Sequence, residues 1–308
     1  INVTTAEQVV GAIESQKKTG YRAVKLYEGL TPEIYRAAVE AAKERDMQVW
    51  THTPAGMTVA DVIALGVDSI EHFEDVEEYV FTPTGDEGEK AGYFDRWANA
   101  DPDKLRELAD ASAANGVWHS PTFAVIAKRD EYGSATDGCF ARPEAGYIGP
   151  GIADWWRGSG ARMGEYTEQK QAARDQQLAL AKMLYDRGAP LLIGTDTPNP
   201  FVVAGFAIHD ELAMFRRAGI PVADVLKIAT AEAARFLGEE GQWGVVTEGA
   251  RADLVLLDAD PHDDLSTLRR PIGVMVNGHW RERAELQAEL DALSERHAAA
   301  AAEAASGE

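Results

Sequence analysis

Residues 23–53, AVKLYEGLTPEIYRAAVEAAKERDMQVWTHT, contain two short apolar runs on either side of a segment with helical periodicity. The runs Ala23–Tyr27 and Gln48–Thr53 have the length and residue types of buried strands. We expect a helix over Pro32–Arg45, because Thr31 is a favourable N-cap and the proline after it suits the first helical position. Strand, helix and strand in this order predict a βαβ unit with parallel strands.

The alternation of strand-like and helical segments continues as far as Thr197. Further strands are expected at Ser69–His72, Gly116–Pro121 and Pro190–Asp196. Further helices are expected at Ala6–Lys18, Val59–Leu65, Asp103–Asn115 and Thr167–Arg187. Because a closed barrel needs eight βα units and only five are visible, we predict an incomplete (β/α)8 TIM-type barrel of the α/β class, comprising about strands four to eight. We expect the first three units to be missing.

The character of the sequence changes after residue 240. Helices are expected before this point at His209–Arg217 and Ala223–Leu237, whereas residues 241–280 hold short strand-like runs separated by Gly and Pro. Residues 281–308 have the charged, Ala-rich composition of a helix. We therefore predict a partial barrel catalytic domain over residues 1–240, part of a small β-sandwich over residues 241–280, and a C-terminal helical tail over residues 281–308.

The segment Val125–Gly164 is long and rich in Gly and aromatic residues. Long irregular segments at the active face of a barrel often serve as lids or as walls of a substrate site. An insertion that only packs over the barrel is the alternative.

The charge balance and the single cysteine limit the partners that this chain can have. Thirty Lys and Arg against 51 Asp and Glu give a net charge of −21, which repels nucleic acid and anionic lipid surfaces. No apolar run is long enough to span a bilayer. Cys139 is the only cysteine, so it cannot form an intramolecular disulfide. We expect no nucleic acid or membrane partner, and a homo-oligomer as one option. The compartment stays unknown; we favour the cytoplasm, although an export signal could lie upstream.

Four polar side chains stand at or near the ends of predicted strands: Lys25, His52, His72 and Asp196. In a barrel of parallel strands, the carboxyl ends meet on one face, where catalytic groups gather. Imidazole nitrogen and carboxylate oxygen both suit Zn or a similar ion. Lys25 lies within an apolar run and Asp196 ends another, so we expect both to be buried and to need a partner or a metal. The four residues therefore predict a metal site.

Each of these residues also has an ordinary structural interpretation. A single His at a strand end is more often hydrogen-bonded in the core or exposed than a metal ligand, and a single Lys usually reaches solvent. Three further residues are candidates for substrate binding: Tyr27, His119 and His209. Tyr27 has the same strand parity as Lys25. His119 could face the pocket or be a core histidine. For His209 the alternative to substrate binding is a role in capping its helix or in supporting a neighbouring site residue.

The ordered motifs of this sequence resemble those of one enzyme superfamily. They are Val24-Lys-Leu26, Thr51-His-Thr-Pro54, Ser69-Ile-Glu-His72, Gly194-Thr-Asp-Thr-Pro198, His209-Asp-Glu-Leu-Ala213, Ala229-Thr-Ala-Glu-Ala-Ala234 and the run 248–258. From about the start of the chain to Trp280 the sequence resembles the amidohydrolase superfamily, particularly its imidazolonepropionase-like and Xaa-Pro dipeptidase-like branch. The resemblance implies a hydrolase that cleaves an amide, peptide or cyclic amide C–N bond with metal-activated water, in a small-molecule or dipeptide substrate.

The resemblance also implies roles for the four strand-end residues. Lys25 would be a carbamylated lysine that bridges two divalent metals, with Zn as the expected ion. His52 and His72 would complete the ligands of the second metal. Asp196 would bind the first metal and act as the catalytic acid and base.

The sequence departs from the family pattern in one respect. The family has a His-x-His pair at the end of its first strand, whereas every other His of this chain is isolated. The chain alone would then provide one metal site, and a second site would be in doubt. A catalytically incomplete fragment or remnant that serves only in folding or assembly is therefore the alternative function. A third hypothesis is a metal-free lyase or isomerase that uses Lys25 as a Schiff base.

Overall fold

The computed structural model describes residues 1–308 except 74, 85–89, 133–135, 164–166 and 307–308. The chain forms two compact units. The first unit comprises Ile1–Pro121 and Gln169–Leu192, and the second comprises Thr122–Glu168 and Ile193–Glu308.

A parallel sheet organises the first unit. Its strands β1 (Ala23–Leu26), β2 (Gln48–Thr51), β3 (Ser69–Glu71) and β4 (Trp118–Ser120) pair in chain order. These strands confirm four of the five that the sequence predicts. The four strands therefore follow one another across the sheet in chain order, as repeated βα units do.

The fifth predicted strand, Pro190–Asp196, does not form as a strand. Leu191 makes only an isolated parallel bridge with His119, and the backbone N–H of Leu192 donates to the His119 carbonyl at 2.8 Å. The chain then leaves extended geometry, and Asp196 adopts a left-handed backbone with φ of 48°. A left-handed residue cannot continue a β ladder, so the prediction of a full strand is wrong.

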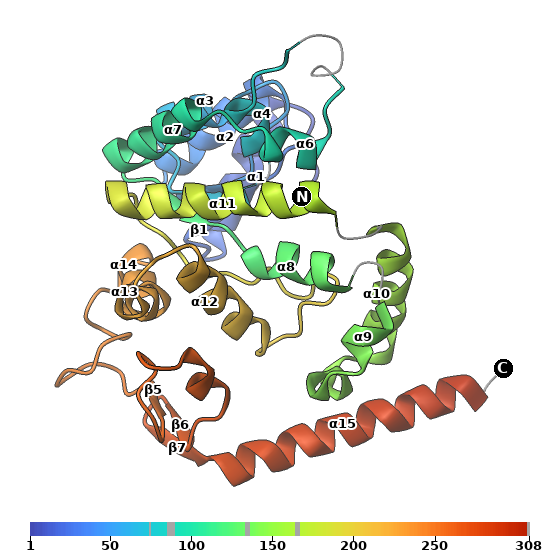
Figure 1. Cartoon of the computed structure of the whole chain (residues 1–308). Coiled ribbons are helices and arrows are strands. Elements are labelled where there is room, and N and C mark those ends of the chain that lie inside the picture. Colours follow the sequence, from blue (N-terminus) through green and yellow to red (C-terminus); the bar gives the residue numbers. More distant parts are fainter. Residues whose placement is uncertain (74, 85–89, 133–135, 164–166, 307–308) are drawn as a thin grey trace. The chain divides into compact units, whose positions relative to one another are not determined.

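Helices accompany the sheet. In the first unit they are α1 (Ala6–Lys18), α2 (Pro32–Lys43), α3 (Val59–Ala64), α4 (Val76–Val80), α6 (Tyr93–Ala98), α7 (Pro102–Asn115) and α11 (Glu168–Arg187) (Figure 1). The sequence predicts these helices except α4 and α6. Thr31 caps α2 as expected, with its side chain accepting from the N–H of Ile34 at 3.4 Å. In α3, Thr58 and Asp61 form a reciprocal capping box.

The strand register sorts side chains onto two faces of the sheet. Residues paired across parallel strands project to the same side, so Lys25 and Trp50 share one face. The opposite face holds a row of buried residues, namely Leu26, Thr51, Ile70 and His119. Helix α2 packs on this buried face, because Tyr35 of α2 hydrogen-bonds Thr51. Lys25 therefore projects away from α2.

The first part of the second unit is largely helical. Its elements are α8 (Phe123–Tyr132), α9 (Thr136–Phe140), η1 (Pro143–Tyr147), α10 (Pro150–Met163), α12 (Ala207–Arg217), α13 (Val222–Lys227), the π-helical turn η2 (Ile228–Glu232) and α14 (Ala233–Phe236). The sequence predicts a long irregular segment over Val125–Gly164. This prediction is wrong, because the described residues there form α8, α9, η1 and α10. Aromatic residues of this segment enter a core instead: Trp156 packs against Phe201 in a buried cluster that includes Cys139.

The C-terminal part of the second unit contains a small antiparallel sheet and a long helix. Strands β5 (Leu254–Leu256), β6 (Gly273–Val276) and β7 (His279–Glu282) pair in order, with η3 (Leu265–Arg269) between the first two. Helix α15 (Arg283–Ser306) ends the described chain. The division at residues 240 and 280 stays a prediction. Among the helices of the described residues, none combines the length and the apolar character that crossing a bilayer requires.

Candidate metal centre

Lys25 and His72 meet at the carboxyl edge of the parallel sheet. Lys25 lies near the end of β1 and His72 directly follows β3, yet the Lys25 Nζ and His72 Nε2 atoms are 3.0 Å apart. If Lys25 is an ammonium, it donates to the lone pair of His72 Nε2, and the imidazole carries its proton on Nδ1. The same lone pair is the one with which an imidazole binds a metal.

His52 brings a second imidazole to the same place. It follows β2, its side chain is buried, and its ring centroid lies 4.9 Å from that of His72, tilted by 45°. Tyr27 also stacks on His52, with ring centroids 4.9 Å apart and an interplanar angle of 18°, and Lys25 Nζ lies 5.2 Å from the Tyr27 ring centroid. Three consecutive strand ends thus bring Lys25, Tyr27, His52 and His72 into one cluster, which we call the strand-end cluster.

A hydrogen-bond relay fixes the backbone at His52. The Thr51 hydroxyl donates to the His52 carbonyl at 2.6 Å, and the Tyr35 hydroxyl lies 2.8 Å from Thr51 Oγ1. Because Thr51 has only one hydroxyl proton, Tyr35 must be the donor in the second bond. Burial raises the pKa of Tyr35 to about 12, so the phenol keeps its proton. No local sequence pattern indicates this relay, since it joins a helix to a strand across the core.

Glu28 adds a negative charge beside the cluster. Its Oε2 lies 4.0 Å from His52 Nδ1, which is too long for a hydrogen bond but close enough for electrostatic attraction. In metal sites, a carboxylate often faces the imidazole nitrogen that does not bind the metal. Glu28 was not predicted as a site residue. Its position directly after Tyr27 at the end of β1 was the available indication.

Two of the predicted ligands have a left-handed backbone. The φ angle is 70° at His72 and 48° at Asp196. This conformation is uncommon for residues other than glycine, and it concentrates where the surrounding structure holds a side chain in a required direction. His72 directly follows β3, at the carboxyl edge of the sheet where a barrel carries its functional groups, and Asp196 lies a few residues beyond the bridge at Leu191.

Asp196 belongs to the second unit, whereas the strand-end cluster belongs to the first. Its carboxylate is held locally, because Asn199 Nδ2 donates to Asp196 Oδ2 at 2.7 Å and to the Asp196 carbonyl at 3.0 Å. The side chains of Asp196 and Lys25 are both exposed. This finding corrects the expectation that both are buried: Lys25 projects from the face of the sheet opposite α2, and Asp196 lies beyond the bridge at Leu191.

The two remaining candidates lie outside the strand-end cluster. His119 is fully buried on the α2 side of the sheet, and its Nε2 is 2.8 Å from the hydroxyl of Ser112 in α7. Burial lowers the pKa of His119 to about 3, so it stays neutral. This geometry favours the alternative of a core histidine. His209 lies in α12 of the second unit, where burial and the charge of Arg269 lower its pKa.

Two side chains of the strand-end cluster are of a type that binds divalent cations. His52 and His72 are two imidazole donors from neighbouring strand ends, and a nitrogen ligand set suits Zn. Within the described residues, no group of three His, Cys, Asp or Glu is placed to hold a metal. A third donor in this unit would therefore have to come from Lys25, which must lose its positive charge to bind a cation.

The fold of this chain is similar to that of several proteins of known structure. The chain is similar to the solved structure of a bottromycin amidohydrolase, with 25% sequence identity and a TM-score of 0.72, over 97% of this chain and 63% of that one. It is also similar to an Xaa-Pro dipeptidase with methionine bound in the active site, at 21% identity and a TM-score of 0.58, covering 91% of this chain and 59% of that one. For an ochratoxinase of A. niger the identity is 18%, the TM-score 0.59, and the coverage 90% and 55%.

The chain spans less than two thirds of the length of each of these three proteins. A comparison with curated protein sequences finds no match. The structural likeness indicates a TIM-barrel-like α/β fold, in agreement with the parallel sheet of the first unit. The model of the amidohydrolase family matches residues 3–281, from before α1 into β7. Because this match covers most of the chain, the protein belongs to the amidohydrolase family.

Proposed function

We propose that this protein is a metal-dependent hydrolase that cleaves a C–N bond in a small molecule or dipeptide. The observation that carries the proposal is the convergence of Lys25, His52 and His72 from three consecutive strand ends, with Lys25 Nζ and His72 Nε2 3.0 Å apart. Membership of the amidohydrolase family supports the reaction type. The bond would be an amide, a peptide or a cyclic amide.

The proposed ligands of the cation are His52, His72, Lys25 and Asp196, with Zn as the expected metal. When bound, the cation would polarise the scissile carbonyl and lower the pKa of a water molecule. Lys25 would take part as a carbamate, since this modification turns a cation into an anionic donor. We propose one bound ion in this unit, because the described residues of the cluster include only two imidazoles.

Other steps of the proposed reaction would depend on side chains of this chain. His72 needs a free Nε2 lone pair, so its proton must stay on Nδ1. Tyr27 would cover one side of His52 and keep bulk water from that ring, as its stacked position at 4.9 Å indicates. Asp196 would take a proton from the attacking water and deliver it to the leaving nitrogen. Asn199 would orient the Asp196 carboxylate for both transfers.

Peptide-type substrates are the preferred class. Two of the similar structures are named as a bottromycin amidohydrolase and an Xaa-Pro dipeptidase. We therefore propose a dipeptide or a modified peptide as substrate. The alternative is a piece that completes its metal site only with another chain, and the observation in its favour is that no three such ligands gather among the residues the structure describes.

Hydrolysis of a dipeptide panel tests the proposal. The protein is supplied with Zn and bicarbonate, and Asp196→Asn is compared with the wild type and with Asp258→Asn, an exposed control in the same unit. Loss of the proton carrier should lower turnover by about 100-fold or more, while the control keeps it. Turnover that survives in Asp196→Asn would contradict the acid-base role. Absence of turnover in the wild type would favour the incomplete piece.

A further inference from the structure

One face of α12 carries an unusual set of side chains. His209, Ala213, Arg216 and Arg217 are spaced so that they lie in one stripe along this helix. Across from them stand Asp264, Leu265, Ser266 and Arg269 at η3. The two sets line a pocket of about 470 Å³ within the second unit. None of the lining residues belongs to the proposed metal ligands.

The lining of this pocket is positively charged. Three arginines, Arg216, Arg217 and Arg269, and one acidic residue, Asp264, line it. Both oxygens of Asp264 are already engaged by Ser266, through its N–H at 2.8 Å and its hydroxyl at 2.7 Å. The lining residues themselves thus carry two more positive than negative charges in a chain with a net charge of −21, and Arg269 also pairs with Asp210, which lies outside the lining.

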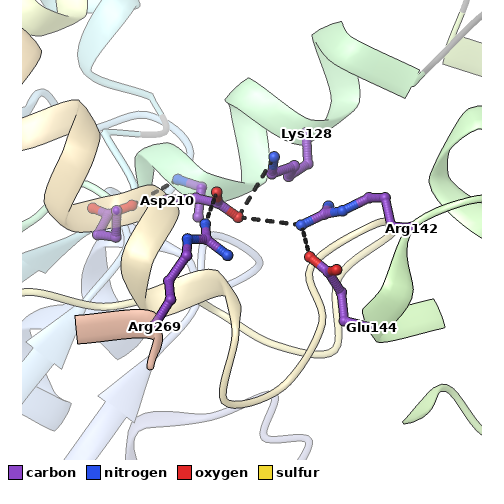
Figure 2. A network of polar contacts seen from close by, with 7 residues as sticks. Lys128, Arg142, Glu144, Asp210 and Arg269 are labelled. Carbon is purple, nitrogen blue, oxygen red and sulfur yellow. Dashed lines mark hydrogen bonds and ion pairs between the residues drawn. The ribbon is translucent and has the colours of Figure 1, made fainter. Parts of the chain in front are cut away.

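The network in Figure 2 holds Arg269 in place. Asp210 accepts from Arg269 at 2.8 Å, and its other oxygen lies 3.5 Å from Lys128 and 3.8 Å from Arg142 (Figure 2). Arg142 also pairs with Glu144. The negative charge of Asp210 is thus shared among three cations. Arg269 is oriented by this contact and still contributes positive charge to the pocket.

The middle of the α12 stripe provides the space. Ala213 lies between His209 and the two arginines along α12, and its small methyl group fills little of the pocket that it lines. Burial and the neighbouring Arg269 lower the pKa of His209, so near neutral pH its ring is an uncharged hydrogen-bonding group. The pocket therefore combines fixed positive charge, a neutral polar group and an unfilled centre.

We propose that this pocket binds a small oxyanion with two negative charges, of the phosphate-ester or dicarboxylate kind. Guanidinium groups match the oxygen geometry of both kinds with paired hydrogen bonds. Two negative charges also balance the excess of the lining. The site goes beyond the proposed hydrolysis, and the metal-free protein suffices to test it, so its failure would leave the metal centre untouched.

Calorimetric titration of the whole chain with inorganic phosphate and, separately, with succinate tests the proposal. One site per chain is expected for at least one anion, and the tighter anion identifies the ligand class. Arg216→Gln should weaken binding by about tenfold or more, since it removes a charge-assisted contact. Ala213→Leu should block the pocket without changing its charge. Both side chains are exposed, so neither change should disturb folding, which circular dichroism can check.

Arg296→Gln is the matched control, because Arg296 is an exposed helical arginine of the same unit that does not line the pocket. It should bind as the wild type does. Lack of binding by both anions would overturn the proposal. Equal binding by the wild type, Arg216→Gln and Ala213→Leu would overturn it as well, since the anion would then sit elsewhere.

Discussion

Replacing Glu211 with Gln should change how the stability of the protein depends on pH. Glu211 lies in α12, its side chain is fully buried, and it accepts a hydrogen bond from the N–H of Ala124 at 2.6 Å. Burial raises its pKa to about 8, and nearby Asp210 adds to the increase, although the hydrogen bonds from the start of α8 oppose it. The folded protein therefore keeps this carboxyl protonated at neutral pH.

The expected magnitude follows from the two pKa values. In the unfolded chain the carboxyl titrates near 4.5, so between pH 4.5 and about 8 the folded state holds one proton that the unfolded state has released. The free energy of unfolding then falls by about 1.4 kcal/mol for each unit of rising pH, and by roughly 5 kcal/mol over the whole window. Gln keeps an acceptor oxygen for Ala124 but does not titrate, so Glu211→Gln should remove this slope.

Urea unfolding followed by circular dichroism measures the effect. At roughly pH 5.5, 6.5 and 7.5, the free energy of unfolding of Glu211→Gln relative to wild type should rise by about 1.4 kcal/mol per pH unit. Glu248→Gln, an exposed control in the same unit, should remain parallel to the wild type. If Glu211→Gln is also parallel to the wild type, the buried carboxyl does not hold its proton and the reasoning fails.

Three further substitutions test other parts of the structure. Below pH 6.5 the wild type should lose about 1.4 kcal/mol of stability per pH unit, because the unfolded chain protonates His119 whereas the folded protein does not until a pKa of about 3. His119→Gln should abolish this loss in acid unfolding, and acid unfolding identical to that of the wild type would contradict the reasoning. Tyr35→Phe should cost about 1 kcal/mol in urea unfolding by removing the bond to Thr51, and a neutral variant would argue against the relay. Asp210→Asn should cost roughly 2–3 kcal/mol, because it leaves three cations without their shared anion, and a change near zero would show that solvent screens the network.

Local sequence patterns were sufficient for most of the first unit. The run Ala23–Tyr27, the N-cap Thr31 and the run Gln48–Thr53 depend on neighbouring residues, and the structure has β1, α2 and β2 at these places. Propensity and capping act over a few residues, so one sequence displays them directly.

The errors in the predicted fold have long-range causes. The segment around Asp196 has the composition of a strand, but only Leu191 finds a partner, because pairing depends on the neighbouring strand rather than on the segment itself. Within Val125–Gly164, Trp156 belongs to a buried cluster with Phe201, which is distant in sequence. Contacts of this kind cannot be inferred from local periodicity.

The candidate site was predictable in part. The rule that strand ends share one face was enough to bring together Lys25, His52 and His72, and strand parity added Tyr27. The side of the sheet that His119 faces depends on its register with β3, which no local pattern reveals. The role of Asp196 as a ligand and as the acid and base stays a proposal.

Metal content is the most direct test of the proposed centre. The protein would be incubated with Zn and bicarbonate, dialysed, and measured by mass spectrometry, together with His52→Ala, His72→Ala and the exposed control His262→Ala. We predict about one or two Zn per wild-type chain, the same content in the control, and loss of Zn when either cluster histidine is removed. A wild-type chain without bound Zn, or equal Zn in the cluster variants, would contradict a metal centre at Lys25, His52 and His72.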